Sequence, residues 1–206
     1  MAEDGRALMG ANIWFISDTH FWHQNMYSFV DAGGRRIRER FVDAAEGDAY
    51  MIQRWADLVR GSDHIYHLGD VCMNRENHGG DAFVRLIRSL PGHKRLVLGN
   101  HDHLKIKWYI EAGFEKIRGS AMVDGLLLTH YPVHPSSIGF KVIGAVHGHT
   151  HQQPDISPKH LNVSVERTDY APISLDEVKA QFAEKARLAS ITVPVVDAMG
   201  TLITGP

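Results

Sequence analysis

The sequence predicts an α/β protein made of one domain. In the first half of the chain, short apolar runs of strand length alternate with segments of helical periodicity, which is typical of layered α/β folds. The second half contains mostly short apolar runs separated by turns, which indicates a second sheet packed on the first. With 206 residues, the chain is long enough to bury one sizeable core. We therefore expect a single domain over residues 1–206.

Three predicted strands of the first half end in polar residues. They are residues 13–16 before Asp18 and His20, residues 64–68 before Asp70, and residues 95–98 before Asn100, His101 and Asp102. Gly99, at the end of the third strand, predicts a backbone conformation that residues with a Cβ avoid. Open α/β sheets bind ligands at the carboxyl ends of their strands, so we expect a site there.

Helical spacing of apolar residues predicts helices at residues 48–60, 81–90, 104–112 and 174–189. Segment 21–41 is predicted as a long polar loop with four arginines. The apolar tail 191–206 is expected to form either an edge strand or a contact in a homo-oligomer.

The second half predicts a mostly antiparallel meander. Its short apolar runs are residues 114–117, 120–123, 126–129, 142–146 and 161–165. Two of them again lead into histidine: His130 follows the third run, and His149 and His151 follow the fourth. Four other histidines flank these motifs: His23, His103, His134 and His147. Each could contact substrate, but a local hydrogen bond is the favoured role.

The composition is that of an ordinary globular protein, with 44% apolar and 22% charged residues. A net charge of −2 gives no reason to expect tight, nonspecific nucleic-acid binding. Cys72 is the only cysteine, which excludes an intrachain disulfide and a zinc–thiolate cage. No apolar stretch approaches the roughly 18 residues of a membrane span, and the N-terminus lacks a signal-peptide core. These features predict a cytoplasmic protein without a membrane partner.

The polar residues at the strand ends predict a metal centre. Their ligand atoms are oxygen and imidazole nitrogen only, which suits Mn, Fe or Zn, with Ni also possible. Three carboxylate or amide groups and four histidines are too many for one ion. They suit two divalent ions that share a bridging carboxylate, at the roughly 3.5–4 Å separation of two-metal hydrolases. One histidine at a strand end would be a weak signal, but five such junctions in one chain make a strong one.

The ordered set of motifs resembles the calcineurin-like metallophosphoesterase superfamily, over about residues 13–172. The motifs are Asp18-Thr19-His20, Gly69-Asp70, Gly99-Asn100-His101-Asp102, His130 and Gly148-His149-Thr150-His151. The amino-acid sequences of these motifs are most similar to those of a small bacterial and phage group of predicted phosphoesterases. The resemblance implies a four-layer α/β/β/α sandwich with two mixed sheets.

The resemblance also implies a role for each site residue. Asp18, His20, Asp70 and His151 would hold the first metal. Asp70 would bridge to the second metal, which Asn100, His130 and His149 would complete. His101 would be the catalytic proton donor, oriented by Asp102.

The expected function is metal-dependent hydrolysis of a phosphoester, with a metal-bridging hydroxide as the nucleophile. A phosphodiester is favoured because it carries one charge and the chain shows no obvious dedicated phosphate clamp beyond the metals. The arginines of segment 31–41 could supply such a clamp. The expected partner is a small phosphoester or a nucleotide. Two alternatives stay open: a phosphomonoesterase or nuclease acting on nucleic-acid ends, and a non-catalytic metal-binding module of the same fold.

Overall fold

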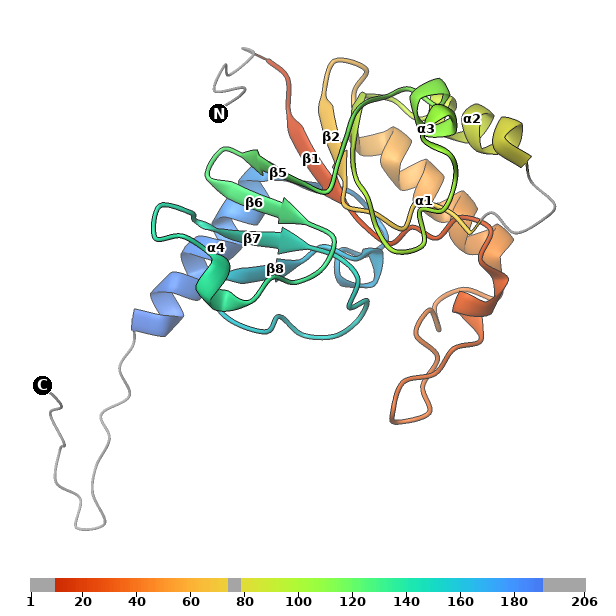
Figure 1. Ribbon diagram of the computed structural model, residues 1–206. Helices are drawn as coiled ribbons and strands as arrows, with labels where there is room; N and C mark the ends of the chain where they lie inside the picture. The colour runs from red at the N-terminus through yellow and green to blue at the C-terminus, as the bar shows by residue number, and fades with distance from the viewer. Residues whose placement is uncertain (1–9, 74–78, 191–206) are drawn as a thin grey trace, which may run out of the picture.

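The computed structural model describes residues 10–73 and 79–190, which form two sheets and flanking helices (Figure 1). The first sheet has the strand order β4-β3-β2-β1-β9, and the second has the order β5-β6-β7-β8. The first-sheet strands are β1 (Ile13–Ile16), β2 (His64–His67), β3 (His93–Val97), β4 (Phe114–Arg118) and β9 (Ile173–Ser174). The second-sheet strands are β5 (Ser120–Val123), β6 (Leu126–Thr129), β7 (Gly144–His147) and β8 (His160–Asn162).

Four α-helices and three short 3-10 helices complete the described fold. The α-helices are α1 (Ala44–Leu58), α2 (Gly79–Ser89), α3 (Ile106–Glu111) and α4 (Leu175–Ser190). The 3-10 helices are η1 (Gln24–Tyr27), η2 (Pro135–Ser137) and η3 (Val165–Arg167). Each predicted α-helix is present within a few residues of its expected bounds. The predicted edge strand or oligomer contact at 191–206 lies outside the described residues.

Helix α1 begins four residues earlier than the apolar spacing predicts, because it has a strong cap. The Asp43 carboxylate accepts the backbone N–H of Glu46 at 3.0 Å, and the Glu46 side chain accepts the N–H of Val42 at 2.7 Å. These reciprocal bonds satisfy donors that an uncapped first turn leaves unpaired. The helix buries Met51 and Trp55 against the first sheet.

Two apolar clusters separate the layers. The first joins residues of α1, α2 and α3 to one face of the first sheet, including Trp55, Phe83, Leu96 and Tyr109. The second joins the two sheets to α4, whose Phe182 ring lies against Gly144 of β7. Figure 1 shows α1, α2 and α3 beside the first sheet and α4 behind the second. The predicted mixed α/β fold with two mixed sheets is therefore confirmed.

The predicted antiparallel meander is wrong for most of the second sheet. Only β5 and β6 pair antiparallel, whereas β6 with β7 and β7 with β8 pair parallel. Segments 130–143 and 148–159 join these parallel pairs, and both are long enough for the crossovers that parallel pairing requires. Consequently the carboxyl ends of β6 and β7 lie at the same edge of the sheet.

In the first sheet, too, the carboxyl ends of neighbouring strands lie at one edge. Strands β1, β2 and β3 run parallel, and β9 adds one antiparallel pair at the edge of the sheet. Beyond the strands, the backbone N–H of Asp18 donates to Gly69 O and that of His20 donates to Asp70 O, both at 3.0 Å. The loops that carry the polar motifs are thus bonded to one another.

None of the described helices is long and apolar enough to cross a lipid bilayer.

Candidate metal centre

The structure brings all seven predicted metal ligands together. Asp18, His20 and His151 form one group, and Asp70, His130 and His149 form a second; within each group the ligand atoms lie within 4.8 Å of one another. Asn100 joins the second group, with its Oδ1 2.9 Å from His130 Nε2 and 3.0 Å from His149 Nδ1. Their role as ligands stays a prediction, but their placement is that of one polar centre.

Asp70 lies between the two groups. Its Oδ2 is 3.5 Å from Nε2 of His20 in the first group and 3.4 Å from Nε2 of His130 in the second. Its Oδ1 accepts the backbone N–H of His101 at 2.7 Å, which fixes the carboxylate. This is the position that a bridging carboxylate needs.

Five of the seven residues have left-handed backbone conformations, with φ between 47° and 69°: Asp18, His20, Asp70, His149 and His151. Residues with a Cβ rarely adopt this region, and each instance carries a local strain of about 1–3 kcal/mol. In this conformation the backbone turns sharply after each strand, so that the polar side chains reach the edge between the sheets.

Unpaired buried atoms indicate that the first group is built for a ligand. Asp18 Oδ1 and both ring nitrogens of His20 are buried and have no hydrogen-bond partner among the described residues. Asp18 Oδ2, in contrast, accepts the Ser164 hydroxyl and the His149 N–H, both at 2.9 Å. Because buried polar atoms without partners are unfavourable, a divalent cation fits the donors that remain.

Burial and neighbouring charges tune the ligand groups. Burial lowers the pKa of His20 well below its ordinary value, which keeps the imidazole neutral and able to bind a metal. Burial opposes ionisation of Asp70, but the hydrogen bond and charge of His130 outweigh it and hold the pKa of this carboxyl below its usual range. Burial also opposes protonation of His130, yet the hydrogen bond with Asp70 raises its pKa. Asp70 is therefore an ionised acceptor near neutral pH.

Two glycines allow the close approach of the loops. A Cβ on Gly99 would lie 2.2 Å from Asp70 Oδ1, and one on Gly148 would lie 2.3 Å from Asp18 Oδ2. The expectation that Gly99 provides an unusual backbone conformation is wrong, because its φ is not positive. Gly99 is required for space beside the carboxylate instead.

The structure assigns Asp102 a different task from the predicted orientation of His101. Its Oδ2 accepts the backbone N–H of Gly99 and of Asp70, at 2.8 and 2.9 Å, and its Oδ1 accepts that of Val71 at 3.0 Å. Among the described residues, no hydrogen bond joins this carboxylate to the His101 ring. Asp102 therefore holds the β2 and β3 loops together and acts on the site through the backbone.

The His101 ring itself lies at the first group, with its centroid 5.3 Å from that of His20. The His23 ring centroid is 5.5 Å from that of His20, and the His103 centroid is 6.1 Å from that of His101. The other two flanking histidines make the expected local bonds: His147 with Gly148 O, and His134 as the cap of η2.

Sequence reasoning missed Glu166, a buried carboxylate beside the first group. Both Glu166 oxygens lie 3.3 Å from His151 Nδ1, and Oε1 accepts a 2.8 Å bond from Nε of the buried Arg38. Burial disfavours the charge of Glu166, but Arg38 outweighs it and lowers the pKa to about 2. Because Arg38 and Glu166 are 128 residues apart in the chain, no local pattern could have indicated the pair.

The paired sheets, with Asp, Asn and His at their common edge, form a metallophosphoesterase type of domain. A model of the calcineurin-like phosphoesterase family matches residues 11–163, and the chain belongs to that family. The predicted resemblance is thereby confirmed.

Relatives in archaea, phage and bacteria share this sequence or fold. The uncharacterized protein MJ1445 of Methanocaldococcus jannaschii is 30% identical over 184 residues, which cover 85% of this chain and 93% of that protein. The gene 66 protein of Mycobacterium phage L5 is 28% identical over 184 residues, covering 74% of this chain and 83% of the phage protein. The crystal structure of AQ665 from Aquifex aeolicus, a protein of unknown function, has 29% identity and a TM-score of 0.62, covering 82% of this chain and 98% of that one. None of these names states a substrate.

Proposed function

We propose that the protein is a metal-dependent phosphodiesterase that uses two divalent ions. The observation that carries the proposal is the position of Asp70 between two groups of three potential ligands each. When bound, such ions lower the pKa of water and offset negative charge on phosphoryl oxygens.

The surroundings of the site favour a singly charged diester over a doubly charged monoester. Three of the four arginines of segment 31–41 are hydrogen-bonded by the protein: Arg38 by Glu166, Arg40 by Asp169, and Arg36 by the backbone carbonyls of Tyr27, Glu39 and Phe41. The fourth, Arg35, is exposed and makes only long ion pairs, at 3.9 Å, with Asp31 and Glu39. The side chains described beside the two groups are mainly imidazoles. They offer hydrogen bonds to a phosphate ester without a dedicated cationic clamp.

His101 is the proposed proton donor to the leaving oxygen. Its backbone N–H is anchored on Asp70, so its ring stays beside the first group. An imidazole is suited to this role because its ordinary pKa lies close to neutral pH.

The test compares hydrolysis of bis-p-nitrophenyl phosphate and p-nitrophenyl phosphate by metal-stripped protein, with Mn, Ni, Zn, Mg or Ca restored in turn. We expect metal-dependent hydrolysis of the diester that exceeds hydrolysis of the monoester, and its loss in Asp70→Asn. Asp124→Asn is the matched control, since Asp124 also has a positive φ but lies on the exposed β5–β6 turn.

His101→Ala is expected to lower turnover of diesters with poor leaving groups by about 10²–10⁴-fold while metal binding is retained. Unchanged turnover on such esters would remove His101 from the reaction. Faster hydrolysis of the monoester would favour the phosphomonoesterase alternative. Stoichiometric metal binding without hydrolysis of either ester would favour the binding-module alternative.

A further inference from the structure

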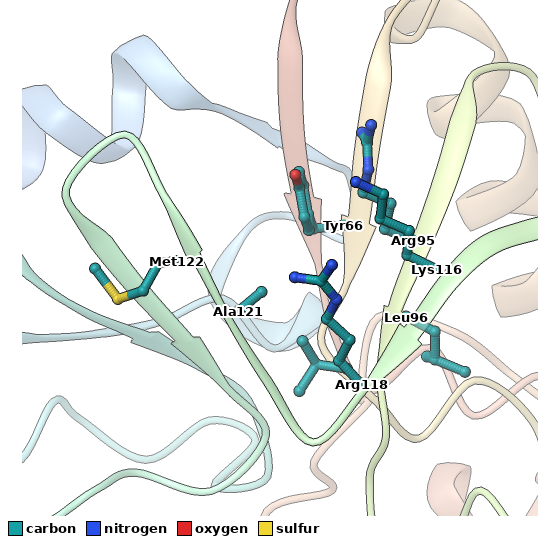
Figure 2. Close-up of a pocket in the computed structure, with 8 residues that line it drawn as sticks. Tyr66, Arg95, Leu96, Lys116, Arg118, Ala121 and Met122 are labelled. Carbon is teal, nitrogen blue, oxygen red and sulfur yellow. The ribbon is translucent and has the colours of Figure 1, made fainter. Parts of the chain in front are cut away.

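Two half-exposed aromatic side chains lie near the candidate metal centre. They are Phe29, which is 45% exposed, and Tyr131, which is 51% exposed. The pocket that residues of β2, β3, β4 and β5 line contains none of the predicted metal ligands (Figure 2). The side chains that contact a substrate at the metal centre are therefore expected beside the ligands themselves.

The Tyr131 ring directly contacts two predicted ligands of the second group. Its centroid is 4.4 Å from that of His149 and 5.1 Å from that of His130. The ring planes are inclined by 60° and 78°, so neither imidazole stacks in parallel on the tyrosine. The tyrosine ring thus lies one side chain away from the place where the second group would hold a phosphoryl oxygen.

The backbone fixes Tyr131 in this position. Its carbonyl oxygen accepts the Thr129 hydroxyl at 2.7 Å, and the preceding carbonyl, that of His130, accepts the backbone N–H of Gly148 at 3.0 Å. Pro132 follows and restricts the backbone of Tyr131 to extended conformations. The ring is therefore held beside the ligands before any substrate arrives, which lowers the entropy cost of binding.

Phe29 lies further from the predicted ligands than Tyr131 does. Its ring centroid is 5.9 Å from that of His23, and the His23 centroid is 5.5 Å from that of His20 in the first group. A histidine ring thus connects Phe29 to the first group, whereas Tyr131 contacts its two ligand rings directly. This difference assigns the closer contact with a substrate to Tyr131.

We propose that Tyr131 stacks on the base of a nucleotide whose phosphate lies at the metal centre. The inference rests on the proposed phosphodiesterase activity and names nucleoside-containing diesters as its substrates. A tyrosine ring is large and rigid, and stacking on it is available to every base because each base has a π-face. One such ring favours nucleotides over alkyl phosphate esters without selecting a particular base.

The first test is calorimetric titration of the Mn-loaded full-length protein with adenosine 5′-phosphate and with ribose 5-phosphate, which lacks the base. We expect adenosine 5′-phosphate to bind about tenfold more tightly, as stacking of one base on one aromatic ring allows. Tyr131→Leu should remove most of this difference, whereas Tyr131→Phe should retain it because the ring remains. Phe140→Leu is the matched control, since Phe140 lies in the same β6–β7 segment and is 92% exposed.

The second test separates base binding from hydrolysis. It compares kcat/KM for the p-nitrophenyl ester of thymidine 5′-phosphate with that for methyl p-nitrophenyl phosphate, two singly charged diesters with the same leaving group. We expect the ratio to favour the thymidine ester, and to fall about tenfold in Tyr131→Leu. Phe140→Leu should keep the ratio of the natural sequence.

Equal affinity for adenosine 5′-phosphate and ribose 5-phosphate would overturn the proposal. An equal loss in Tyr131→Leu and Tyr131→Phe would also overturn it, because the hydroxyl group and not stacking would then bind the ligand. Loss of the base preference in Phe29→Leu, with none in Tyr131→Leu, would place the base beside the first group instead.

The two tests together distinguish this proposal from the proposed activity. A base preference that depends on Tyr131, without hydrolysis of either ester, would support base binding and contradict the phosphodiesterase. Hydrolysis of both esters at a ratio that does not depend on Tyr131 would support the phosphodiesterase and overturn base binding.

Discussion

The Glu166 side chain connects a buried cation to a predicted metal ligand. Arg38, which is fully buried, donates to Glu166 through Nε and to the backbone carbonyls of Asp18 and Thr19 through its two other nitrogens. Glu166 in turn faces Nδ1 of His151. A carboxylate at Nδ1 favours the imidazole tautomer that leaves Nε2 free to bind a metal.

We expect Glu166→Gln to weaken metal binding about 10–100-fold and to destabilise the fold by about 3–5 kcal/mol. The variant removes the preferred partner of His151 Nδ1, and it leaves Arg38 as a buried charge without its counter-ion. Metal titration monitored by calorimetry and unfolding by urea measure the two effects separately.

Glu184→Gln is the control for this change. Glu184 forms an exposed ion pair with Arg187 on α4, and the same substitution there should leave metal affinity unchanged. If Glu166→Gln folds and binds metal as tightly as the natural sequence, Glu166 does not position His151.

The sequence predicts which residues gather at the candidate site better than it predicts which residues surround them. The seven predicted ligand positions follow from strand ends that carry Asp, Asn and His, a pattern that is local in the sequence. The roles of Glu166 and Asp102 depend on contacts between distant segments, and polar residues at such positions look like ordinary surface residues. Arg38 illustrates this limit, because a basic loop predicts exposure, whereas its burial requires the carboxylate of Glu166 from the other end of the domain.

At the scale of elements, helix α1 is coupled to the β1 loop through a buried carboxyl group. Asp48 of α1 is 6% exposed, and its Oδ2 accepts the backbone N–H of Trp22 at 2.7 Å. Burial raises the pKa of Asp48 from 3.8 to about 6, although the Trp22 hydrogen bond and the charge of Arg38 lower it. The folded protein therefore holds this proton more tightly than the unfolded chain does.

This pKa shift predicts a stability that falls as the pH rises from about 4 to 6, because unfolding then releases a proton. Relative to Asp48→Asn, the natural sequence should lose up to about 3 kcal/mol of unfolding free energy across that interval. Asn keeps an oxygen that can accept the Trp22 N–H, so the comparison isolates the charge. Urea unfolding of metal-free protein at several pH values measures the difference.

Asp124→Asn, at an exposed position, controls for the loss of one carboxylate. A difference between the natural sequence and Asp48→Asn that does not change with pH would mean that Asp48 ionises equally well in the folded and unfolded states.

The second sheet shows why element types are easier to predict than strand pairing. All five short runs that the sequence predicts as strands in the second half contain strands of the structure, because apolar runs bounded by turns are local signals. Their direction of pairing depends on long loops that carry no such signal. The parallel arrangement of β6, β7 and β8 matters for the candidate metal centre, since it brings His130, His149 and His151 to one edge.

At the scale of the molecule, the metal centre draws on both sheets. Asp18, Asp70 and Asn100 follow strands of the first sheet, and His130, His149 and His151 follow strands of the second. Bound ions would therefore link the sheets as well as the loops. They would also offset part of the strain of the five left-handed residues among the predicted ligands.

We expect metal binding to raise the midpoint of thermal unfolding of the whole domain in one step. A free ion concentration about 100 times the dissociation constant adds about 2.7 kcal/mol of stability. For a domain of this size, that corresponds to an increase of about 5–10 °C. Differential scanning calorimetry of metal-stripped protein, with and without Mn, measures the shift, and Asp124→Asn should show it as the natural sequence does.

Asp70→Asn should lose most of the increase, because both ligand groups depend on this carboxylate. An increase confined to one of two separate transitions would mean that the ions stabilise one sheet and do not join the two.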